Sequence, residues 1–147
     1  MIAPNGGLIK SIFIKFEFFL FNFIKKMKLG EHLLIDIICD DILNMNSNIL
    51  NSLEKLEELS DKLIKICNLT KLSSIKHKFD PQGITLITML SESHISMHTW
   101  PENNSICIDI FSCNNILNIE KVKETLHEYF MINKIIIKLV DRTISKL

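Results

Sequence analysis

Four short segments with strand character follow one another along the middle of the chain, with only turn signals between them. The segments cover roughly residues 73–79, 83–90, 94–100 and 105–112. Proline, glycine and asparagine mark the breaks at residues 81–83 and 101–104. The last segment, SICIDIFSC, alternates isoleucine with other residues at a period of two, which is typical of a strand with two different faces. Strands joined by such short turns pair as antiparallel neighbours, so the sequence predicts a mainly antiparallel sheet.

Helical patterns lie on both sides of this group of strands. Residues 47–67 carry apolar side chains at helical spacing, with charged residues on the opposite side. A second helix is predicted at about 118–131 with Asn118 as its N-cap, and two further strands are predicted at 32–38 and 134–140. This order predicts an α+β fold, a two-layer sandwich with two helices on one face of the sheet. We expect a homodimer in which the sheet face without helices in one copy packs against the same face of the second copy.

The composition narrows the possible partners. The chain has 147 residues, which suggests one domain, and its 17 basic residues balance its 17 acidic residues. A formal net charge of zero argues against nucleic-acid binding. The four cysteines form no CxxC pair, so we expect reduced thiols and a cytoplasmic protein.

The first 26 residues stand apart from the rest of the chain. Residues 11–24 are strongly apolar, but a lysine and a glutamate interrupt them, and the run is short for a transmembrane helix. No small-residue cleavage site of a signal peptide follows. The sequence MKLGEHLLID, from Met27 on, is typical of the start of a domain. We therefore expect residues 1–26 to be an apolar extension of uncertain role, residues 27–147 to form the domain, and no membrane association.

The segment LSESHISMHTWPE, residues 90–102, is unusually polar for a strand. It carries three serines, two histidines, two glutamates and the only tryptophan of the chain. Polar side chains are costly to bury without partners. Such a density therefore indicates either an exposed edge or a reactive site.

Three sequence blocks occur in order along the chain: HKFDPQG at 77–83, LSESHISMHTWPE at 90–102 and IDIFSC at 108–113. Together with GEHLLIDIICD at 30–40, they strongly resemble the bacterial and archaeal type of S-adenosylmethionine decarboxylase, a pyruvoyl-dependent enzyme. The resemblance covers about residues 27–140. It implies conversion of S-adenosylmethionine to decarboxylated S-adenosylmethionine and carbon dioxide, for spermidine biosynthesis.

The resemblance also implies that the chain cuts itself between Glu92 and Ser93. The Ser93 hydroxyl would attack the Glu92 carbonyl and convert the peptide bond into an ester. Elimination would then leave a beta chain that ends at Glu92 and an alpha chain of residues 93–147, whose first residue becomes a covalently bound pyruvoyl group. His98 matches the base that removes the Ser93 Cα proton, a role that suits histidine near neutral pH. Thr85 stands where the family usually has a serine that supports processing.

The same resemblance assigns residues of the mature site. The pyruvoyl group derived from Ser93 would form a Schiff base with the substrate amine and accept electrons as carbon dioxide leaves. Cys113 matches the proton donor, and a thiol readily gives and regains a proton. Phe79 and Trp100 match aromatic residues that would sandwich adenine, and Glu102 matches a carboxylate for the ribose hydroxyls. Because the family builds its sites at a dimer interface, Phe79 and Glu102 are expected to serve the neighbouring protomer.

Two alternatives for the function remain open. A pyruvoyl-dependent decarboxylase of ornithine or arginine would need only a different pocket, because the pyruvoyl group accepts any α-amino acid. A non-catalytic homologue could instead act as a binding or regulatory subunit. The presence of Phe79, Trp100 and Glu102 favours the nucleoside substrate over ornithine or arginine. The intact set of Glu92-Ser93, His98 and Cys113 argues against a non-catalytic homologue.

Two other kinds of site are weakly supported by the residues. His77, His94, His98 and Cys113 lack the spacing of metal-ligand pairs, so no metal is expected. The glycines of a hydrolase nucleophile elbow do not surround Ser93. We expect the remaining three cysteines to be small buried hydrophobic residues: Cys39, Cys67 and Cys107.

Overall fold

The computed structural model describes residues 26–40, 49–113 and 118–145 of the 147-residue chain. Its contacts divide the chain into two units. Gly30–Arg142 form the larger unit, and Met1–Leu29 with Thr143–Leu147 form the smaller one. In the smaller unit the described residues are the beginning of one strand and the end of another. The predicted apolar extension, residues 1–26, lies outside the described residues except for its last residue.

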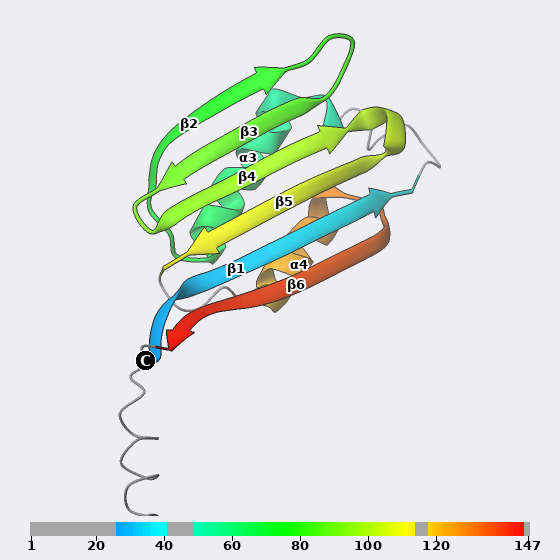
Figure 1. Cartoon of the computed structure of the whole chain (residues 1–147). Coiled ribbons are helices and arrows are strands. Elements are labelled where there is room, and N and C mark those ends of the chain that lie inside the picture. Colours follow the sequence, from blue (N-terminus) through cyan, green and yellow to red (C-terminus); the bar gives the residue numbers. More distant parts are fainter. Residues whose placement is uncertain (1–25, 41–48, 114–117, 146–147) are drawn as a thin grey trace, which may run out of the picture. The chain divides into compact units, whose positions relative to one another are not determined.

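Within the described part of the chain, six strands form one antiparallel sheet in the order β2-β3-β4-β5-β1-β6 (Figure 1). The strands are β1 (Lys26–Cys39), β2 (Lys71–Lys78), β3 (Ile84–Leu90), β4 (Ser93–Trp100), β5 (Ser105–Ser112) and β6 (Ile132–Ser145). The four strands predicted in the middle of the sequence pair one after another as antiparallel neighbours. Strand β1 then pairs with β5, and β6 lies beyond it at the edge. The prediction of a mainly antiparallel sheet is confirmed.

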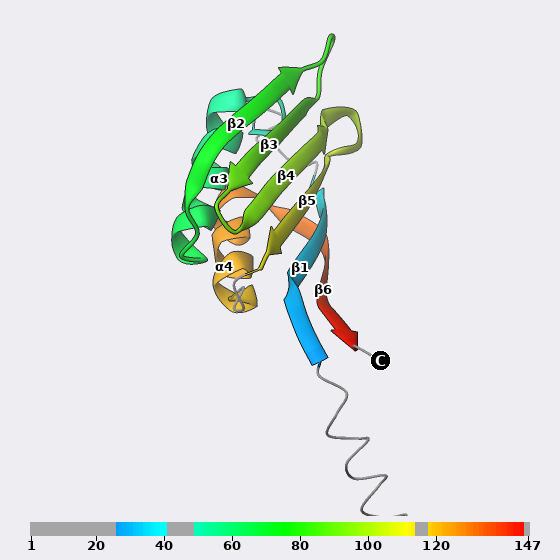
Figure 2. The same ribbon diagram turned by 60° about the vertical axis from the view of Figure 1, so that its left-hand side comes forward.

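The helices α3 (Leu53–Ile66) and α4 (Ile119–Tyr129) cover the same face of the sheet (Figure 2). Alternate residues of each inner strand point to this face, because successive side chains of a strand point to opposite sides. They pack against the apolar sides of the helices, and the fully buried residues include Leu33, Ile35, Leu56, Leu63, Leu86, Met97, Ile108 and Leu126. The predicted two-layer sandwich is confirmed. No described helix is long and apolar enough to span a bilayer.

The start of α3 differs from the prediction. The Ser52 side chain accepts a hydrogen bond from the Lys55 backbone N–H at 3.3 Å, and this N-cap sets the first turn of the helix. The segment predicted as one helix over 47–67 is interrupted at residues 51–52: residues 49 and 50 are helical, and α3 begins at Leu53. The capping prediction for α4 is confirmed, since the Asn118 side chain accepts from a backbone N–H of the first turn at 3.1 Å.

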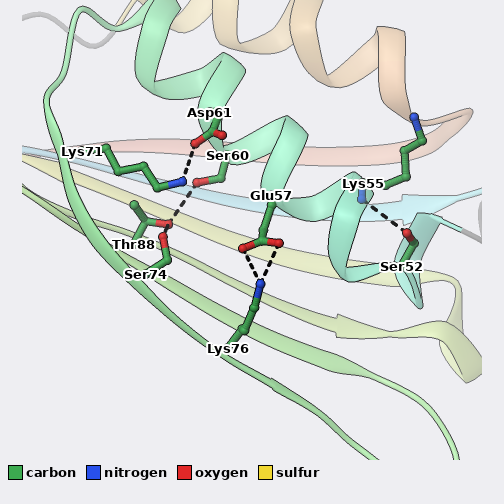
Figure 3. Close-up of polar contacts among 9 residues, drawn as sticks. All are labelled: Ser52, Lys55, Glu57, Ser60, Asp61, Lys71, Ser74, Lys76 and Thr88. Carbon is green, nitrogen blue, oxygen red and sulfur yellow. Dashed lines mark hydrogen bonds and ion pairs between the residues drawn. The ribbon is translucent and has the colours of Figure 1, made fainter.

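Polar contacts hold α3 over the outer strands of the sheet (Figure 3). Lys76 of β2 pairs with Glu57, with N–O distances of 2.7 and 2.8 Å, and Lys71 pairs with Asp61 at 2.6 Å. Three hydroxyls bridge α3, β3 and β2 with successive distances of 3.1 Å: Ser60, Thr88 and Ser74. Because the buried hydroxyl of Thr88 is satisfied in this way, it costs little stability inside the core. These contacts fix α3 against the β2–β3 pair.

The other face of the sheet carries no helix among the described residues. Large apolar side chains are exposed on this open face, namely Ile38, Ile75, Met89, Ile136 and Val140. Polar side chains of β2 and β4 point to the same side. An exposed apolar patch rimmed by polar groups is typical of an interaction surface.

Candidate active site on the β3–β4 hairpin

The turn between β3 and β4 consists of Ser91 and Glu92, and Leu90 pairs with Ser93 across it. Ser93 has a φ angle of +147°, in a region that is largely reserved for glycine. A residue with a Cβ atom typically stores about 1–3 kcal/mol of strain in such a conformation. The Glu92–Ser93 peptide bond therefore lies at a strained point of the backbone.

Two residues just outside the neighbouring strands hold Glu92, Thr70 before β2 and Cys113 after β5. Its carboxylate accepts hydrogen bonds from the backbone N–H of Thr70 at 3.0 Å and from the Thr70 hydroxyl at 3.1 Å. Its carbonyl oxygen accepts a hydrogen bond from the backbone N–H of Cys113 at 2.9 Å. The Thr70 N–H is the largest of the causes that lower the pKa of Glu92, because it stabilises the charged carboxylate.

Cys113 follows β5 directly, and its side chain is exposed. Ser112, the residue before it, pairs with Ser93 of the neighbouring strand. Gly30 of β1 lies against this segment with a φ angle of +149°. A Cβ atom at Gly30 would lie 2.4 Å from the Ser112 carbonyl oxygen and 2.9 Å from the Cys113 Cα atom. Only glycine therefore allows β1 to pass so close to the segment that carries Cys113.

Thr85 and His98 form a second polar pair, at the end of the hairpin away from the turn. They are directly opposite each other on β3 and β4, and Thr85 Oγ1 lies 2.9 Å from His98 Nδ1. A strand rises about 3.3 Å per residue, so His98 lies about 16 Å along β4 from Ser93. His98 is therefore out of reach of the Ser93 backbone in the same chain.

Two hollows on the open face connect these residues. One, of about 640 Å³, is lined by Ser93, Ser96 and His98, together with apolar residues of β2 and β3. The other, of about 330 Å³, is lined by residues that include Phe79, Trp100, Glu102, Thr85 and His98. Phe79 and Trp100 are 49% and 40% exposed there, so part of each ring is accessible to a ligand. His98 borders both hollows.

The residues expected from the sequence thus fall into two groups. The cleavage cluster consists of Glu92, Ser93 and Cys113. The hairpin-end cluster consists of Phe79, Thr85, His98, Trp100 and Glu102. The structure brings the members of each cluster together, but within one chain it does not bring the two clusters together.

Two residues beside the cleavage cluster were not identified from the sequence. Gly30 belongs to the block GEHLLIDIICD, but nothing in the block indicates its contact with the segment after β5. Thr70 belongs to none of the recognised blocks, and it lies 22 residues before Glu92. Its only sequence signal is its position between the end of a helical pattern and the start of a strand pattern.

A group of aromatic rings lies on the open face next to the cleavage cluster. The rings of His32 and His94 each contact Phe111, at centroid distances of 5.7 and 5.8 Å, and lie 6.2 Å from each other. Burial lowers the pKa of His32 despite the opposing charge of Asp109, whose Oδ1 lies 3.9 Å from its Nε2. Among the described residues, no three His, Cys, Asp or Glu side chains gather in a way that could hold a metal ion.

The other cysteines differ from Cys113 in exposure. Cys39 and Cys67 are buried, as expected, whereas Cys107 is half-buried. Burial, followed by the nearby charge of an aspartate, raises the pKa of Cys39 to about 11. Burial and then a hydrogen bond to Asp36 raise the pKa of Cys107 to about 11. Cys113 is therefore the thiol of this chain that is open to solvent.

Comparison with known proteins gives consistent matches. Residues 34–143 match the family model for S-adenosylmethionine decarboxylase. An S-adenosylmethionine decarboxylase proenzyme of Aquifex aeolicus is 37% identical over 87 residues, which span 59% of this chain and 61% of that protein. The proenzyme of the same name from Clostridium botulinum is 36% identical over 113 residues, which span 77% of this chain and 93% of that protein.

A solved structure agrees with these sequence matches. The crystal structure of the adenosylmethionine decarboxylase from Aquifex aeolicus superimposes with a TM-score of 0.68 and 29% sequence identity. The superposition covers 81% of this chain and 94% of that one. The stretch that matches the family model, 34–143, contains every member of the cleavage cluster and of the hairpin-end cluster. This chain belongs to the S-adenosylmethionine decarboxylase family.

Proposed function

We propose that this chain is a proenzyme that cuts itself between Glu92 and Ser93 and then decarboxylates S-adenosylmethionine with the pyruvoyl group formed at residue 93. The product would be decarboxylated S-adenosylmethionine, the aminopropyl donor for spermidine. The relatives from Aquifex aeolicus and Clostridium botulinum carry the name proenzyme, which supports maturation by cleavage. The observation that carries the proposal is the strained Ser93, next to a carbonyl group held by the Cys113 N–H.

Self-cleavage requires an acyl shift followed by an elimination. The Ser93 oxygen adds to the Glu92 carbonyl carbon, the C–N bond breaks, and the amide becomes an ester with a free Ser93 amine. Loss of the Ser93 Cα proton then expels the Glu92 carboxylate and leaves dehydroalanine, which takes up water and releases ammonia to give the pyruvoyl group. The Cys113 N–H, already on the carbonyl oxygen, is placed to stabilise the oxyanion of the first step.

The base for the elimination has to come from a second copy of the chain. His98 lies about 16 Å along β4 from Ser93 of its own chain. Donation from His98 Nδ1–H to the Thr85 hydroxyl, 2.9 Å away, would leave Nε2 free to accept the Cα proton. Thr85 would thus support processing by setting the tautomer of His98.

A homodimer packed through the open faces would bring the two clusters together. The exposed apolar side chains on this face support such packing, because they would leave water on association. In an antiparallel arrangement of two copies, the cleavage cluster of one protomer would face the hairpin-end cluster of its partner. Each dimer would then contain two equivalent composite sites.

The mature site would use the same residues for the substrate. Once formed, the pyruvoyl group supplies a carbonyl that binds the substrate amine and withdraws electrons as carbon dioxide leaves. The exposed thiol of Cys113, beside residue 93, would return a proton to the substrate Cα atom. Phe79 and Trp100 would hold the adenine between their faces and attract the sulfonium charge, and Glu102 would bind the ribose hydroxyls.

We also place the enzyme in the cytoplasm. All four cysteines of the chain lie among the described residues, and none of them forms a disulfide bond. Free thiols persist in the reducing environment of the cytoplasm.

The intact mass of the purified protein tests the maturation, and release of carbon dioxide tests the substrate. We expect two chains that separate between Glu92 and Ser93, with a pyruvoyl mass on the second one, and carbon dioxide from S-adenosylmethionine. Release of carbon dioxide only from ornithine or arginine would show that S-adenosylmethionine is not the substrate. A single uncut chain without activity would indicate a binding or regulatory homologue instead.

A further inference from the structure

The Glu92 side chain has a partner that the cleavage chemistry does not use. Both of its carboxylate oxygens accept hydrogen bonds from Thr70, one from the backbone N–H and one from the hydroxyl. In the opposite direction, the Ser91 N–H donates to the Thr70 carbonyl oxygen at 2.9 Å. Thr70 therefore contacts both residues of the turn, and it does so through three of its polar groups. We call these three hydrogen bonds the Thr70 clamp.

Thr70 is itself firmly placed. The residue before it, Leu69, packs against the core and donates its backbone N–H to the Ile64 carbonyl oxygen at the end of α3, at 2.9 Å. The residue after it, Lys71, pairs in the sheet with Leu90 and forms an ion pair with Asp61 of α3 (Figure 3). The clamp thus connects the turn to the α3–β2 junction.

The clamp acts on the residue whose carbonyl carbon reacts. On one side Thr70 holds the Glu92 carboxylate, and on the other side the Cys113 N–H holds the Glu92 carbonyl oxygen. With both ends fixed, the Glu92 peptide plane has little freedom to rotate. Attack requires the reacting atoms to approach within about 3–3.5 Å in the correct orientation, so small rotations of this plane lower the rate.

We propose that Thr70 is a positioning residue for self-cleavage, which holds the Glu92 carboxylate and so orients the Glu92 carbonyl group for attack by the Ser93 hydroxyl. The proposal rests on self-cleavage between Glu92 and Ser93 and assigns the clamp to the first of its two steps. Its role is distinct from that of His98, which belongs to the elimination. Loss of the clamp therefore leaves the chain as an amide, whereas loss of His98 leaves it as an ester.

The experiment measures the cleavage of freshly refolded full-length chains with time. Glu92→Ala removes both side-chain hydrogen bonds, and Thr70→Val removes the hydroxyl while keeping the shape and the backbone N–H. Thr70→Ser keeps the hydroxyl and should recover most of the rate. Glu124→Ala, which removes an exposed carboxylate on α4, is the matched control. We expect Glu92→Ala to cleave at least about tenfold more slowly, as for the loss of hydrogen bonds to a charged group, and Thr70→Val to show a smaller decrease.

Hydroxylamine at neutral pH distinguishes the two steps, because it cleaves an ester at residues 92–93 but not the amide. The uncut Glu92→Ala and Thr70→Val chains should resist it, whereas uncut His98→Ala should be cut. Each clamp variant should unfold at the temperature of the control.

Three results would overturn the assignment of Thr70. These are wild-type cleavage rates in both clamp variants, accumulation of hydroxylamine-sensitive ester in them, or slow cleavage that only follows a lower unfolding temperature. Cleavage of the wild-type protein shows whether the assignment of Thr70 or the proposed self-cleavage itself is wrong. If the wild-type chain itself does not cut between Glu92 and Ser93, the maturation is wrong, and the clamp has no cleavage step to serve.

Discussion

The Thr85 hydroxyl lies 2.9 Å from Nδ1 of His98, at the end of the hairpin opposite to the Glu92–Ser93 bond. The pair is held together by the direct register of β3 and β4, so it is formed before any second copy binds. The histidine that we propose as the base is therefore held at a separate place on the chain from the Glu92–Ser93 bond.

This separation predicts complementation between two inactive variants. Ser93→Ala cannot cut itself, and His98→Ala lacks the base, so each protein alone should stay as a single chain. When the two are expressed together with different tags, the His98→Ala chain should be cut, because its partner supplies the histidine. Mass spectrometry of each tagged chain checks this. An uncut His98→Ala chain in a proven mixed dimer would mean that the histidine acts within its own chain or not at all.

Substitutions at Thr85 should affect cleavage through His98. Thr85→Val removes the hydroxyl that orients the imidazole, and we expect cleavage to slow by about tenfold, the effect of one lost hydrogen bond of about 1.4 kcal/mol. Thr85→Ser keeps the hydroxyl and should cleave at nearly the wild-type rate. Electrophoresis of samples taken during refolding follows both reactions. Equal rates for the valine and serine variants would remove Thr85 from the processing machinery.

Strain at Ser93 can be measured in chains that cannot cleave. Ser93→Gly and Ser93→Ala both lack the nucleophile, but only glycine accepts a φ angle of +147° without strain. In a urea titration, we expect the free energy of unfolding of Ser93→Gly to exceed that of Ser93→Ala by about 1 kcal/mol or more. At Ser96, in the regular part of β4, Ser96→Gly should instead have a lower free energy of unfolding than Ser96→Ala, because glycine weakens an ordinary strand.

The close approach of Gly30 predicts a localised defect. In Gly30→Ala the new methyl group meets the Ser112 carbonyl oxygen at 2.4 Å, so the segment that carries Cys113 has to move. We expect a loss of about 2 kcal/mol or more in unfolding free energy and little self-cleavage. Gly83→Ala shares the positive φ angle, but its nearest contact is 3.2 Å and lies far along the hairpin from Cys113. That variant should lose stability and still cut itself.

Thiol modification should be selective for Cys113. The thiols of Cys39 and Cys107 have pKa values of about 11, so at pH 8 only about 0.1% of each is the reactive thiolate. Iodoacetamide should therefore label Cys113 first, and peptide mapping identifies the site. Decarboxylase turnover should decrease as the labelled fraction of Cys113 increases. Full activity after complete labelling of Cys113 would reject its role as proton donor.

Much of the fold could be predicted because its signals are local. The alternation of Ile106, Ile108 and Ile110 defines a strand within a few residues, and Asn118 defines a helix start by its own side chain. The start of α3 was predicted too early because apolar spacing continues through Ser52, and only the cap itself interrupts the helix. The insertion of β1 between β5 and β6 could not be predicted, since it depends on pairing between distant segments.

In the candidate site, too, residues with local sequence signals could be predicted, and residues that act through distant contacts could not. Ser93, His98 and Cys113 lie in short recognisable blocks, whereas the separation of Ser93 from His98 into two clusters became evident only in the folded chain. Thr70 and Gly30 act through contacts that only the folded chain creates. A threonine before a strand and a glycine at the beginning of a sequence block have many other uses, so no local pattern distinguishes them.

The order of the strands has a consequence for the protein after cleavage. The cut would leave β1, α3, β2 and β3 in one fragment and β4, β5, α4 and β6 in the other. Because β1 lies between β5 and β6, the fragments interleave, and neither one keeps a continuous sheet without the other. Unfolding would therefore become dissociation of two chains, and the stability of the mature enzyme would rise with its concentration, whereas that of the uncut protomer would not.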